Sequence, residues 1–229
     1  MKRFFVTGTD TEIGKTFVTC GLLVALRDRG INAAPMKPIA AGTIEKDGAS
    51  ANEDVHALME TYAKPLEVSL VNPYCFNEAI APHIAAAHEG RVVDLGVIQN
   101  AYNVLSASHD TVLVEGAGGF LVPLSATESM SILPVTLKLD VILVVGMRLG
   151  CLNHALLTAE AIAARGLRLA GWVANTVDTN MSCFAENVAT LTAALPAPCL
   201  GIVPRLPPAA PIVSAKVAAT FLNTEPLLD

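Results

Sequence analysis

The fold of this chain is decided by the stretch Phe4-Phe5-Val6-Thr7-Gly8-Thr9-Asp10-Thr11-Glu12-Ile13-Gly14-Lys15-Thr16. It predicts a buried strand, a loop bounded by Gly8 and Gly14, and a helix that opens on Lys15 and Thr16. Backbone N–H groups at such a helix N-terminus bind phosphate, the lysine ammonium reaches the outer phosphates, and the threonine hydroxyl ligates Mg²⁺. We therefore predict that Lys15 and Thr16 bind a nucleotide and do not merely mark a strand-to-helix turn.

The spacing of this loop departs from the common pattern. Five residues lie between Gly8 and Gly14, one more than the usual phosphate-binding loop places there. Read strictly, the first position of the motif falls on Thr9. The strand before the loop and the helix after it still favour phosphate binding over a coincidence of Gly, Lys and Thr.

Length and composition bound the fold and the class of partner. A chain of 229 residues can form one domain, and we expect residues 1–229 to do so. Half of the residues are hydrophobic (52%), which suits a large core with buried parallel strands. The net charge of −6 and the lack of a basic run argue against nucleic acid as a partner.

Apolar runs and cysteine usage bear on the cellular compartment. The longest apolar runs, such as Val141 to Val145, have the length of a strand and are too short to cross a bilayer. Residues 1–20 lack the pattern of a signal peptide. The five cysteines are scattered without metal-ligand spacing, which favours reduced thiols in a cytoplasmic protein.

Short β-rich runs alternate with helical patterns along the chain. This alternation predicts an α/β fold, a single-domain doubly wound sheet that is mostly parallel and has helices on both faces. The predicted strands are Arg3–Thr7, Ala33–Met36, Thr111–Glu115, Val141–Gly146, Leu169–Asn175 and Cys199–Val203. The predicted helices are Lys15–Arg29, Asp54–Tyr62, Leu95–Ser108, Asn153–Ala164 and Ser182–Ala194.

Two further segments complete this picture. We expect Ile39 to Val93 to contain loops and helices, without a second sheet, and to pack over the carboxyl edge of the main sheet, where open α/β folds bind ligands. The proline-rich residues 204–211 predict a fixed surface loop before a short terminal helix.

Lys37 and Glu115 each follow a predicted strand. Lys37 either reaches the same crevice as Lys15 or is an ordinary solvated lysine. Glu115 precedes a glycine-rich run, Gly116–Gly119, that lets the backbone approach an anionic ligand. It is either a carboxylate for Mg²⁺, which we favour, or an exposed residue of a glycine turn.

Three other positions allow two interpretations each. Asn52 or Asp54 caps the next helix, unless Asp54 is needed as an oxygen ligand for Mg²⁺. Asn175 at the end of a strand either contacts an adenine edge or forms a turn. The segment from Gly146 to His154 enters a helix whose free N–H groups can hold a carboxylate, and its Cys151 reads as a small packing residue.

Together these residues resemble the dethiobiotin synthetase family. The resemblance covers most of the chain, and the long spacing of the phosphate loop is itself usual in that family. It is carried by the segments Val6–Thr16, Lys37–Ala40, Asn72–Tyr74, Val114–Gly119, Val145–Thr158 and Gly171–Asn175.

The resemblance implies a P-loop NTPase-like fold and an ATP-dependent ligase of biotin biosynthesis. In this reaction an amine of 7,8-diaminopelargonate captures CO₂ as a carbamate, whose oxygen attacks the γ-phosphate of ATP. The second amine then displaces phosphate from the mixed anhydride and closes a cyclic urea, which gives dethiobiotin, ADP and phosphate. Carbamate and triphosphate are both anionic, so cations must bring them together.

The resemblance also implies roles for individual residues. Lys15 and Lys37 are the catalytic cations, and Mg²⁺ is held by Thr16, Asp54 and Glu115. The implied ATP contacts are Glu12, Ile13, Gly14, Lys15, Thr16, Phe17, Asp54, Glu115, Gly116, Ala117, Gly118, Asn175, Thr176, Pro204, Arg205 and Leu206. The implied substrate contacts are Thr11, Lys37, Ala41, Gly118, Leu149, Gly150, Cys151 and Asn153. The last four bind the distant carboxylate from a second subunit, so the resemblance implies a homodimer with its active site at the interface.

Two positions depart from the family pattern. Ala41 stands where the family usually has a serine beside the diamine. Losing one such hydrogen bond costs about 0.5–1.5 kcal/mol, so we expect activity with weaker substrate binding. The loop from Pro204 to Pro211 also lacks the acidic residue that relatives often place near the ribose.

Two rival functions are less consistent with the sequence. An amide synthase acting on a corrin-type carboxylate generally carries a further glutamine-hydrolysing domain, for which this chain has no room. A partitioning-type nucleotide switch usually has an extra lysine near the start of the loop, where this chain has Thr9, Asp10 and Thr11. No amphipathic membrane-binding tail follows either.

Overall fold

A parallel sheet forms the centre of the molecule in the computed structural model, which describes residues 2–46, 49–62 and 64–228. Within these residues the sheet has six strands in the order β10-β9-β8-β1-β7-β2, and each neighbouring pair is parallel. Its strands are β1 (Lys2–Gly8), β2 (Ala33–Met36), β7 (Thr111–Glu115), β8 (Asp140–Met147), β9 (Leu169–Thr176) and β10 (Cys199–Val203). The doubly wound parallel sheet predicted from the sequence is thus confirmed.

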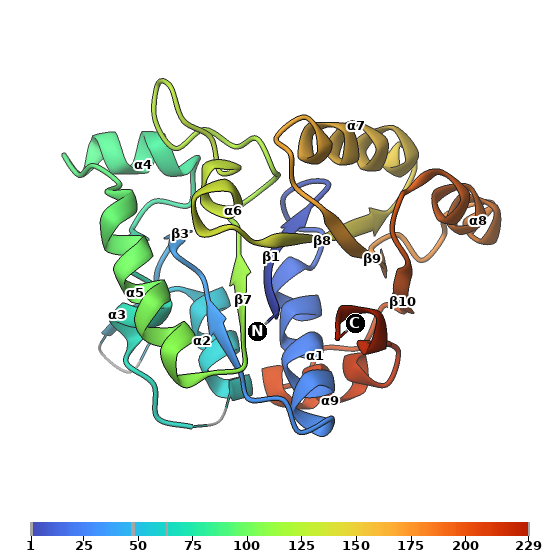
Figure 1. Ribbon diagram of the computed structural model, residues 1–229, viewed down its shortest axis with the longest axis horizontal. Coiled ribbons are helices and arrows are strands. Elements are labelled where there is room, and N and C mark those ends of the chain that lie inside the picture. The colour runs from blue at the N-terminus through green and yellow to red at the C-terminus, as the bar shows by residue number, and fades with distance from the viewer. Residues whose placement is uncertain (1, 47–48, 63, 229) are drawn as a thin grey trace.

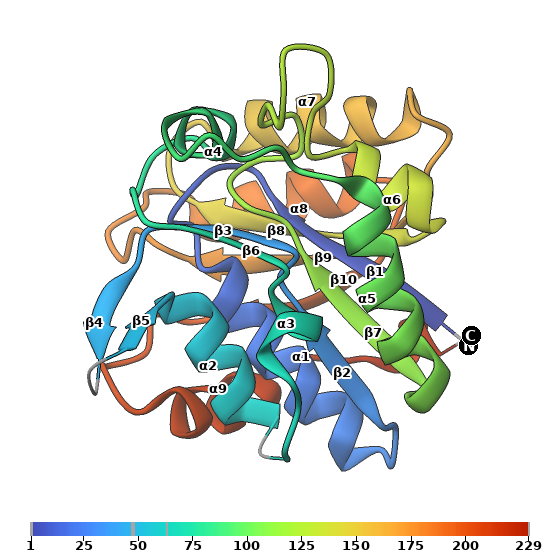
Figure 2. The same cartoon turned by 90° about the vertical axis from the view of Figure 1, so that its left-hand side faces the viewer.

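Helices cover both faces of this sheet (Figures 1 and 2). One face packs against α1 (Lys15–Asp28), α2 (Glu53–Tyr62) and α9 (Pro211–Ala219). The other packs against α5 (Leu95–Ser108), α6 (Ile132–Leu137), α7 (Cys151–Ala163) and α8 (Phe184–Ala194). Successive side chains of a strand point to opposite faces, so Phe4 and Val6 lie in the first core and Phe5 in the second.

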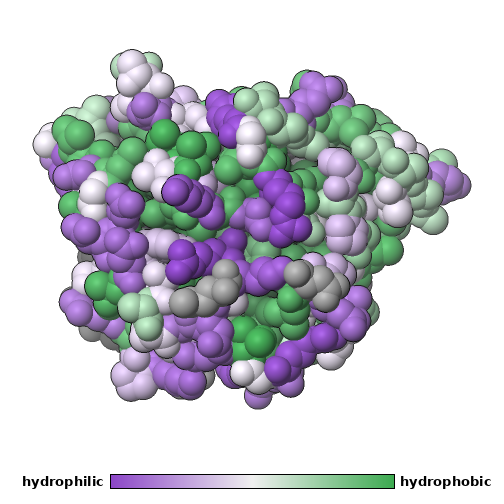
Figure 3. Space-filling view, in the orientation of Figure 1, coloured by the Kyte–Doolittle hydropathy of each residue, from purple (hydrophilic) through white to green (hydrophobic). Residues whose placement is uncertain are grey.

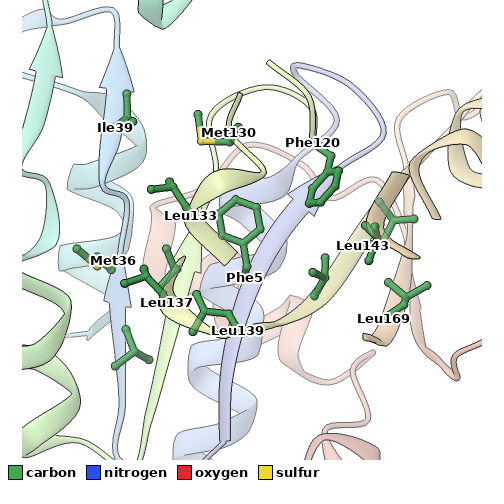
Figure 4. Packing of buried hydrophobic residues seen from close by; sticks show 14 of the residues in the cluster. Phe5, Met36, Ile39, Phe120, Met130, Leu133, Leu137, Leu139, Leu143 and Leu169 are labelled. Atoms are coloured by element: carbon green, nitrogen blue, oxygen red, sulfur yellow. The ribbon is translucent and has the colours of Figure 1, made fainter. Parts of the chain in front are cut away.

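The second core fixes the phosphate-loop strand against its neighbours. Phe5 is fully buried and shares a cluster with Met36 of β2 and with Leu133 and Leu137 of α6 (Figure 4). Burying one such side chain stabilises the fold by about 1.5–3 kcal/mol. The strand that leads into the phosphate loop therefore has little freedom to move.

The interval from Ile39 to Val93 differs from our expectation, because it does contain strands. β3 (Ile39–Ala41) pairs in parallel with β6 (Tyr74–Phe76), and β4 (Ile44–Lys46) pairs antiparallel with β5 (Ala49–Ala51). Strands of three residues are too short to show a two-residue period, so the sequence pattern misses them. The interval also holds the short helices α3 (Val68–Val71) and α4 (Pro82–His88).

Several element ends also differ from the prediction. Helix α7 begins at Cys151, two residues before the predicted Asn153, and α8 begins at Phe184. Pro211 is the first residue of α9, so it does not belong to the preceding loop; proline suits the first helical turn because the N–H it lacks would be unpaired there. Helix α6 and the terminal 3-10 helix (Glu225–Leu227) were not predicted. In the described part of the chain no helix combines the length and apolar character that a membrane span requires.

Candidate active site

The phosphate loop leaves β1 and is tied to the end of β8. The backbone N–H of Thr9 donates to the carbonyl of Val144 (3.0 Å), and the N–H of Gly146 donates to the hydroxyl of Thr9 (3.2 Å). Directly after β8, the Arg148 guanidinium pairs with the Asp10 carboxylate. These contacts hold the loop over the carboxyl edge of the sheet, and neither Asp10 nor Arg148 was predicted as part of the site.

The loop needs glycine where it meets the helix. Gly14 has a φ of +82°, in the left-handed region that favours glycine. A Cβ there would lie 2.3 Å from Nδ2 of Asn175. The reason for the close approach is that this amide donates to the carbonyl of Ile13 (2.7 Å). Asn175 of β9 thus supports the turn between the loop and the helix.

Lys15 lies at the start of α1, with its side chain folded back along the loop. It is buried, and its ammonium donates to the carbonyl of Asp10 (2.9 Å). Burial lowers the pKa of Lys15 to about 8, although the nearby Glu115 carboxylate acts in the opposite direction. A phosphate group would supply the counter-charge that this desolvated ammonium lacks.

Four polar side chains from four elements meet beside Lys15. The Lys37 ammonium lies 2.6 Å from Oε1 of Glu115 and 2.7 Å from Oδ2 of Asp54. The Thr16 hydroxyl donates to the same Oε1 of Glu115 (2.6 Å). The ends of β2 and β7 thus face the beginnings of α1 and α2, as the predicted topology requires.

Burial decides between the interpretations that the sequence left open. Lys37 is only 3% exposed and Glu115 is fully buried, so neither is an ordinary surface residue. Asn52, and not Asp54, caps α2, because its side-chain oxygen accepts from the N–H groups of Asp54 (3.1 Å) and Val55 (3.2 Å). Asp54 is therefore available for the charged cluster.

The charges of this cluster stabilise one another. Burial by itself disfavours the charged form of Lys37, but the attraction and hydrogen bonds of Glu115 and Asp54 prevail and raise its pKa. Burial likewise opposes ionisation of Asp54, and the charge of Lys37 prevails and lowers the pKa of that carboxyl. The cluster is thus an ion-paired network in which Lys37 and Glu115 are shielded from water and Asp54 is partly exposed.

The oxygen atoms of the cluster fit Mg²⁺, which prefers carboxylate and hydroxyl oxygens. Oε2 of Glu115 is buried and has no hydrogen-bond partner among the residues that the structure describes, which is costly unless a ligand satisfies it. Among the described residues no three His, Cys, Asp or Glu side chains gather as a metal cage. This donor set suits an ion that keeps water molecules and takes phosphate oxygens as further ligands.

A cleft of about 860 Å³ opens above the cluster. Its lining includes Thr11, Glu12, Gly14–Phe17, Lys37, Ala41, Asp54, Ala117 and Gly118. The residues 79–82 and Val122 complete an apolar wall that the sequence did not predict. The only local signal for this wall was Pro82, which marks the start of α4. The interval from Ile39 to Val93 thus covers the carboxyl edge of the sheet, as expected.

Comparisons with known proteins agree with this site. A family model described as an AAA domain matches residues 2–212. The ATP-dependent dethiobiotin synthetase BioD of Cellvibrio japonicus is 48% identical over 100% of this chain and 98% of its own length. That of Pseudomonas aeruginosa (strain UCBPP-PA14) is 51% identical over 99% and 98% of the two chains. The chain belongs to the ATP-dependent dethiobiotin synthetase family.

Two solved structures share the fold of this synthetase family member. The MinC:MinD cell division protein complex of Aquifex aeolicus superposes with a TM-score of 0.56 at 14% identity, covering 96% of this chain and 86% of that one. A ParA family ATPase from Chlorobium tepidum gives 0.54 at 14% identity, covering 96% and 92%. At this identity the likeness shows the fold alone, which is the P-loop NTPase-like fold predicted above.

Several residues singled out by the resemblance, among them Gly116 and Asn175, are not part of the cleft lining given above. Asn175 is buried and hydrogen-bonded to the loop, whereas Thr176 is the last residue of β9 and Pro204–Leu206 follow β10. Leu149, Gly150 and Asn153 are exposed around the start of α7, and Cys151 is buried there. A single copy of this dethiobiotin synthetase chain thus brings together the phosphate loop and the charged cluster. The segment at the start of α7 faces outward.

Proposed function

We propose that this protein joins CO₂ to 7,8-diaminopelargonate at the expense of ATP and closes the cyclic urea of dethiobiotin. The observation that carries the proposal is the meeting of Thr16, Lys37, Asp54 and Glu115 beside the phosphate loop, in a chain about half identical to synthetases of this name. We further propose that residues 1–229 act as one domain in the cytoplasm, which is consistent with five unpaired cysteines.

The two lysines and the two carboxylates have different proposed roles in phosphoryl transfer. In our proposal Lys15 and the N–H groups from Glu12 to Phe17 bind the β- and γ-phosphates. Lys37 neutralises the carbamate oxygen as it attacks, and the N–H groups of Gly116–Gly118 approach the anion. Thr16, Asp54 and Glu115 hold Mg²⁺, which when bound neutralises charge on the transferring phosphoryl group.

The cleft fits the rest of the substrate. The amines would lie near Thr11 and Gly118, and the alkyl chain against Ala41 and the apolar wall formed by residues 79–82. Ala41 brings no hydroxyl to this site, so we propose weaker binding of the diamine than a serine would give. The distant carboxylate is left for the outward-facing segment Leu149–Asn153 of a second copy.

Asn175 offers a test of how the nucleoside is bound. Replacing it by alanine removes the hydrogen bond to Ile13 and is expected to weaken nucleotide binding by about two- to tenfold. If Asn175 acts through the loop, ATP and GTP should lose affinity equally, as measured by calorimetry. A loss confined to ATP would instead assign the side chain to adenine.

A homodimer is proposed because the start of α7 exposes apolar side chains. Leu149 is 96% exposed, and Leu156 and Leu157 of α7 are also exposed. Figure 3 shows apolar residues gathered on the α7 and α8 side of this face, with hydrophilic residues across its centre. Buried in an interface, such side chains would place Asn153 and the N-terminus of α7 next to the other copy.

Leu149→Asp is expected to shift this dimer towards monomers, because a carboxylate cannot be buried there without a partner. Light scattering after size exclusion measures the mass. Lys216→Asp on the exposed side of α9 is the matched control and should stay dimeric. A wild-type protein that is monomeric at working concentration would contradict the proposal.

The decisive experiment supplies purified protein with ATP, Mg²⁺, bicarbonate and the diamine, and detects the cyclic urea by mass together with phosphate. We expect product and phosphate in equal amounts. ATP turnover that is indifferent to the diamine would favour the nucleotide switch instead.

A further inference from the structure

The ammonium of Lys37 occupies a position between the two carboxylates that we propose as metal ligands. It lies at 2.6 Å from Glu115 and 2.7 Å from Asp54, and both contacts are charge-assisted hydrogen bonds. Lys15 is different, because its ammonium donates to the backbone carbonyl of Asp10. Of these two lysines, Lys37 is the one in direct contact with Asp54 and Glu115.

A metal ion and this ammonium cannot share the space between the carboxylates. Mg²⁺ requires its oxygen ligands at about 2.0–2.1 Å. Two carboxylate oxygens that both ligate the ion therefore leave no room between them for the Lys37 ammonium. Like charges in a partly desolvated site also repel strongly. An ion that binds Oδ2 of Asp54 and Oε1 of Glu115, the two oxygens that the ammonium contacts, therefore requires Lys37 to leave.

The backbone of Lys37 allows only its side chain to move. Its N–H donates to the carbonyl of Val71 (2.8 Å), and its carbonyl accepts from the amide of Asn72 (2.6 Å). Pro38 further restricts the conformation of Lys37. The ammonium can nevertheless swing on a four-carbon stem, and Lys37 lines the cleft into which it would turn.

We propose that Lys37 is a place-holding cation that competes with the divalent ion for Asp54 and Glu115. Before nucleotide binds, Lys37 neutralises the buried Glu115 and the half-exposed Asp54. When the ion arrives with ATP, it takes over this pair and sends the Lys37 ammonium into the cleft, towards the carbamate. This inference rests on the proposed metal site, and it makes metal–nucleotide binding the step that positions Lys37.

Mn²⁺ binding without nucleotide tests the competition, because Mn²⁺ uses the same oxygen ligands and the free ion is measured by electron paramagnetic resonance. We expect Lys37→Met to bind Mn²⁺ at least about tenfold more tightly than the wild type, a difference that corresponds to about 1.4 kcal/mol. Mn²⁺ alone should also raise the melting temperature of Lys37→Met but not that of the wild type.

Lys15→Met is the matched control, since it removes an equal charge from a buried lysine of the same cleft that does not touch the carboxylates. Its Mn²⁺ affinity should change several-fold less than that of Lys37→Met. Equal changes in the two variants would indicate general repulsion and overturn the proposal, as would an unchanged affinity in Lys37→Met. If Lys37→Met does not fold, Lys37→Gln carries the same expectation.

A further measurement distinguishes a wrong assignment of the metal site from a wrong model of the competition. Wild-type protein with a non-hydrolysable ATP analogue should bind one Mn²⁺ per chain. If it binds none, the proposed assignment of Asp54 and Glu115 is wrong, and the place-holding role of Lys37 is wrong with it. If it binds one while both lysine variants behave like wild type without nucleotide, only the competition is refuted.

Discussion

Lys37→Gln should lower the rate of ring closure by at least about a hundredfold, since the charge that faces the transferring phosphoryl group is lost. Glutamine keeps most of the length and the hydrogen-bonding capacity of lysine but carries no positive charge. The measurement is the rate of dethiobiotin formation by mass spectrometry, with the melting temperature recorded in parallel. Lys216→Gln, on the exposed side of α9, is the control.

The same substitution should also weaken the fold. Removing one partner of a buried ion pair typically costs about 3–5 kcal/mol, because the other charge stays buried. The amide of glutamine can still donate to Glu115 or Asp54, so we expect a loss at or below the lower end of this range. Near-normal turnover in folded Lys37→Gln would remove Lys37 from the chemistry.

Lys15→Met should abolish ATP-dependent turnover and yet stabilise the protein without nucleotide. The lysine is desolvated, and within the described part of the chain its ammonium donates to a backbone carbonyl, whereas methionine fills a similar volume without charge. ATP should raise the melting temperature of the wild type, and this increase should be lost in Lys15→Met. Both effects appear in one series of thermal melts.

The free energy of unfolding should depend on pH because the pKa of Lys15 differs between the folded and the unfolded chain. The folded protein holds the pKa of Lys15 at about 8, below the value of 10.5 for an unperturbed lysine. Between these values the unfolded chain binds more protons, so the contribution of Lys15 to stability rises with pH. The full cost, on the order of 3 kcal/mol, applies below about pH 8 and vanishes above about pH 10.5.

The advantage of Lys15→Met over the wild type should therefore be largest near pH 7 and shrink towards pH 10. Urea unfolding at three or four pH values measures it. Lys37 has the opposite sign, because its folded pKa is raised and its contribution to stability is present at neutral pH and lost only at high pH. An advantage that grows with pH would contradict the assignment of Lys15 as a desolvated ammonium.

Local patterns in the sequence were sufficient for the main elements. The strands Ala33–Met36, Thr111–Glu115 and Cys199–Val203 and the helix Leu95–Ser108 have the predicted bounds. Their hydrophobic period and their end signals are properties of neighbouring residues. The three-residue strands β3 and β6 were missed, because what stabilises them is pairing between segments more than thirty residues apart.

The candidate site depends more strongly on contacts that are distant in sequence. Thr16 meets Glu115 across 99 positions, and Lys37 meets Glu115 across 78. The sequence placed each of these residues at a strand or helix end, and the resemblance grouped them. It could not choose between Asn52 and Asp54 as the helix cap, because both residue types are good caps.

By itself the sequence determined the phosphate loop, the alternation of strands and helices, and the family to which the chain belongs. Each of these is written in short runs of residues whose spacing has a local physical meaning. Only the tertiary structure decided that Lys37 sits between Asp54 and Glu115 and that Asn175 supports Ile13. The reason is that burial and pairing of charges depend on which strand ends meet, and chain folding alone brings them within hydrogen-bonding distance.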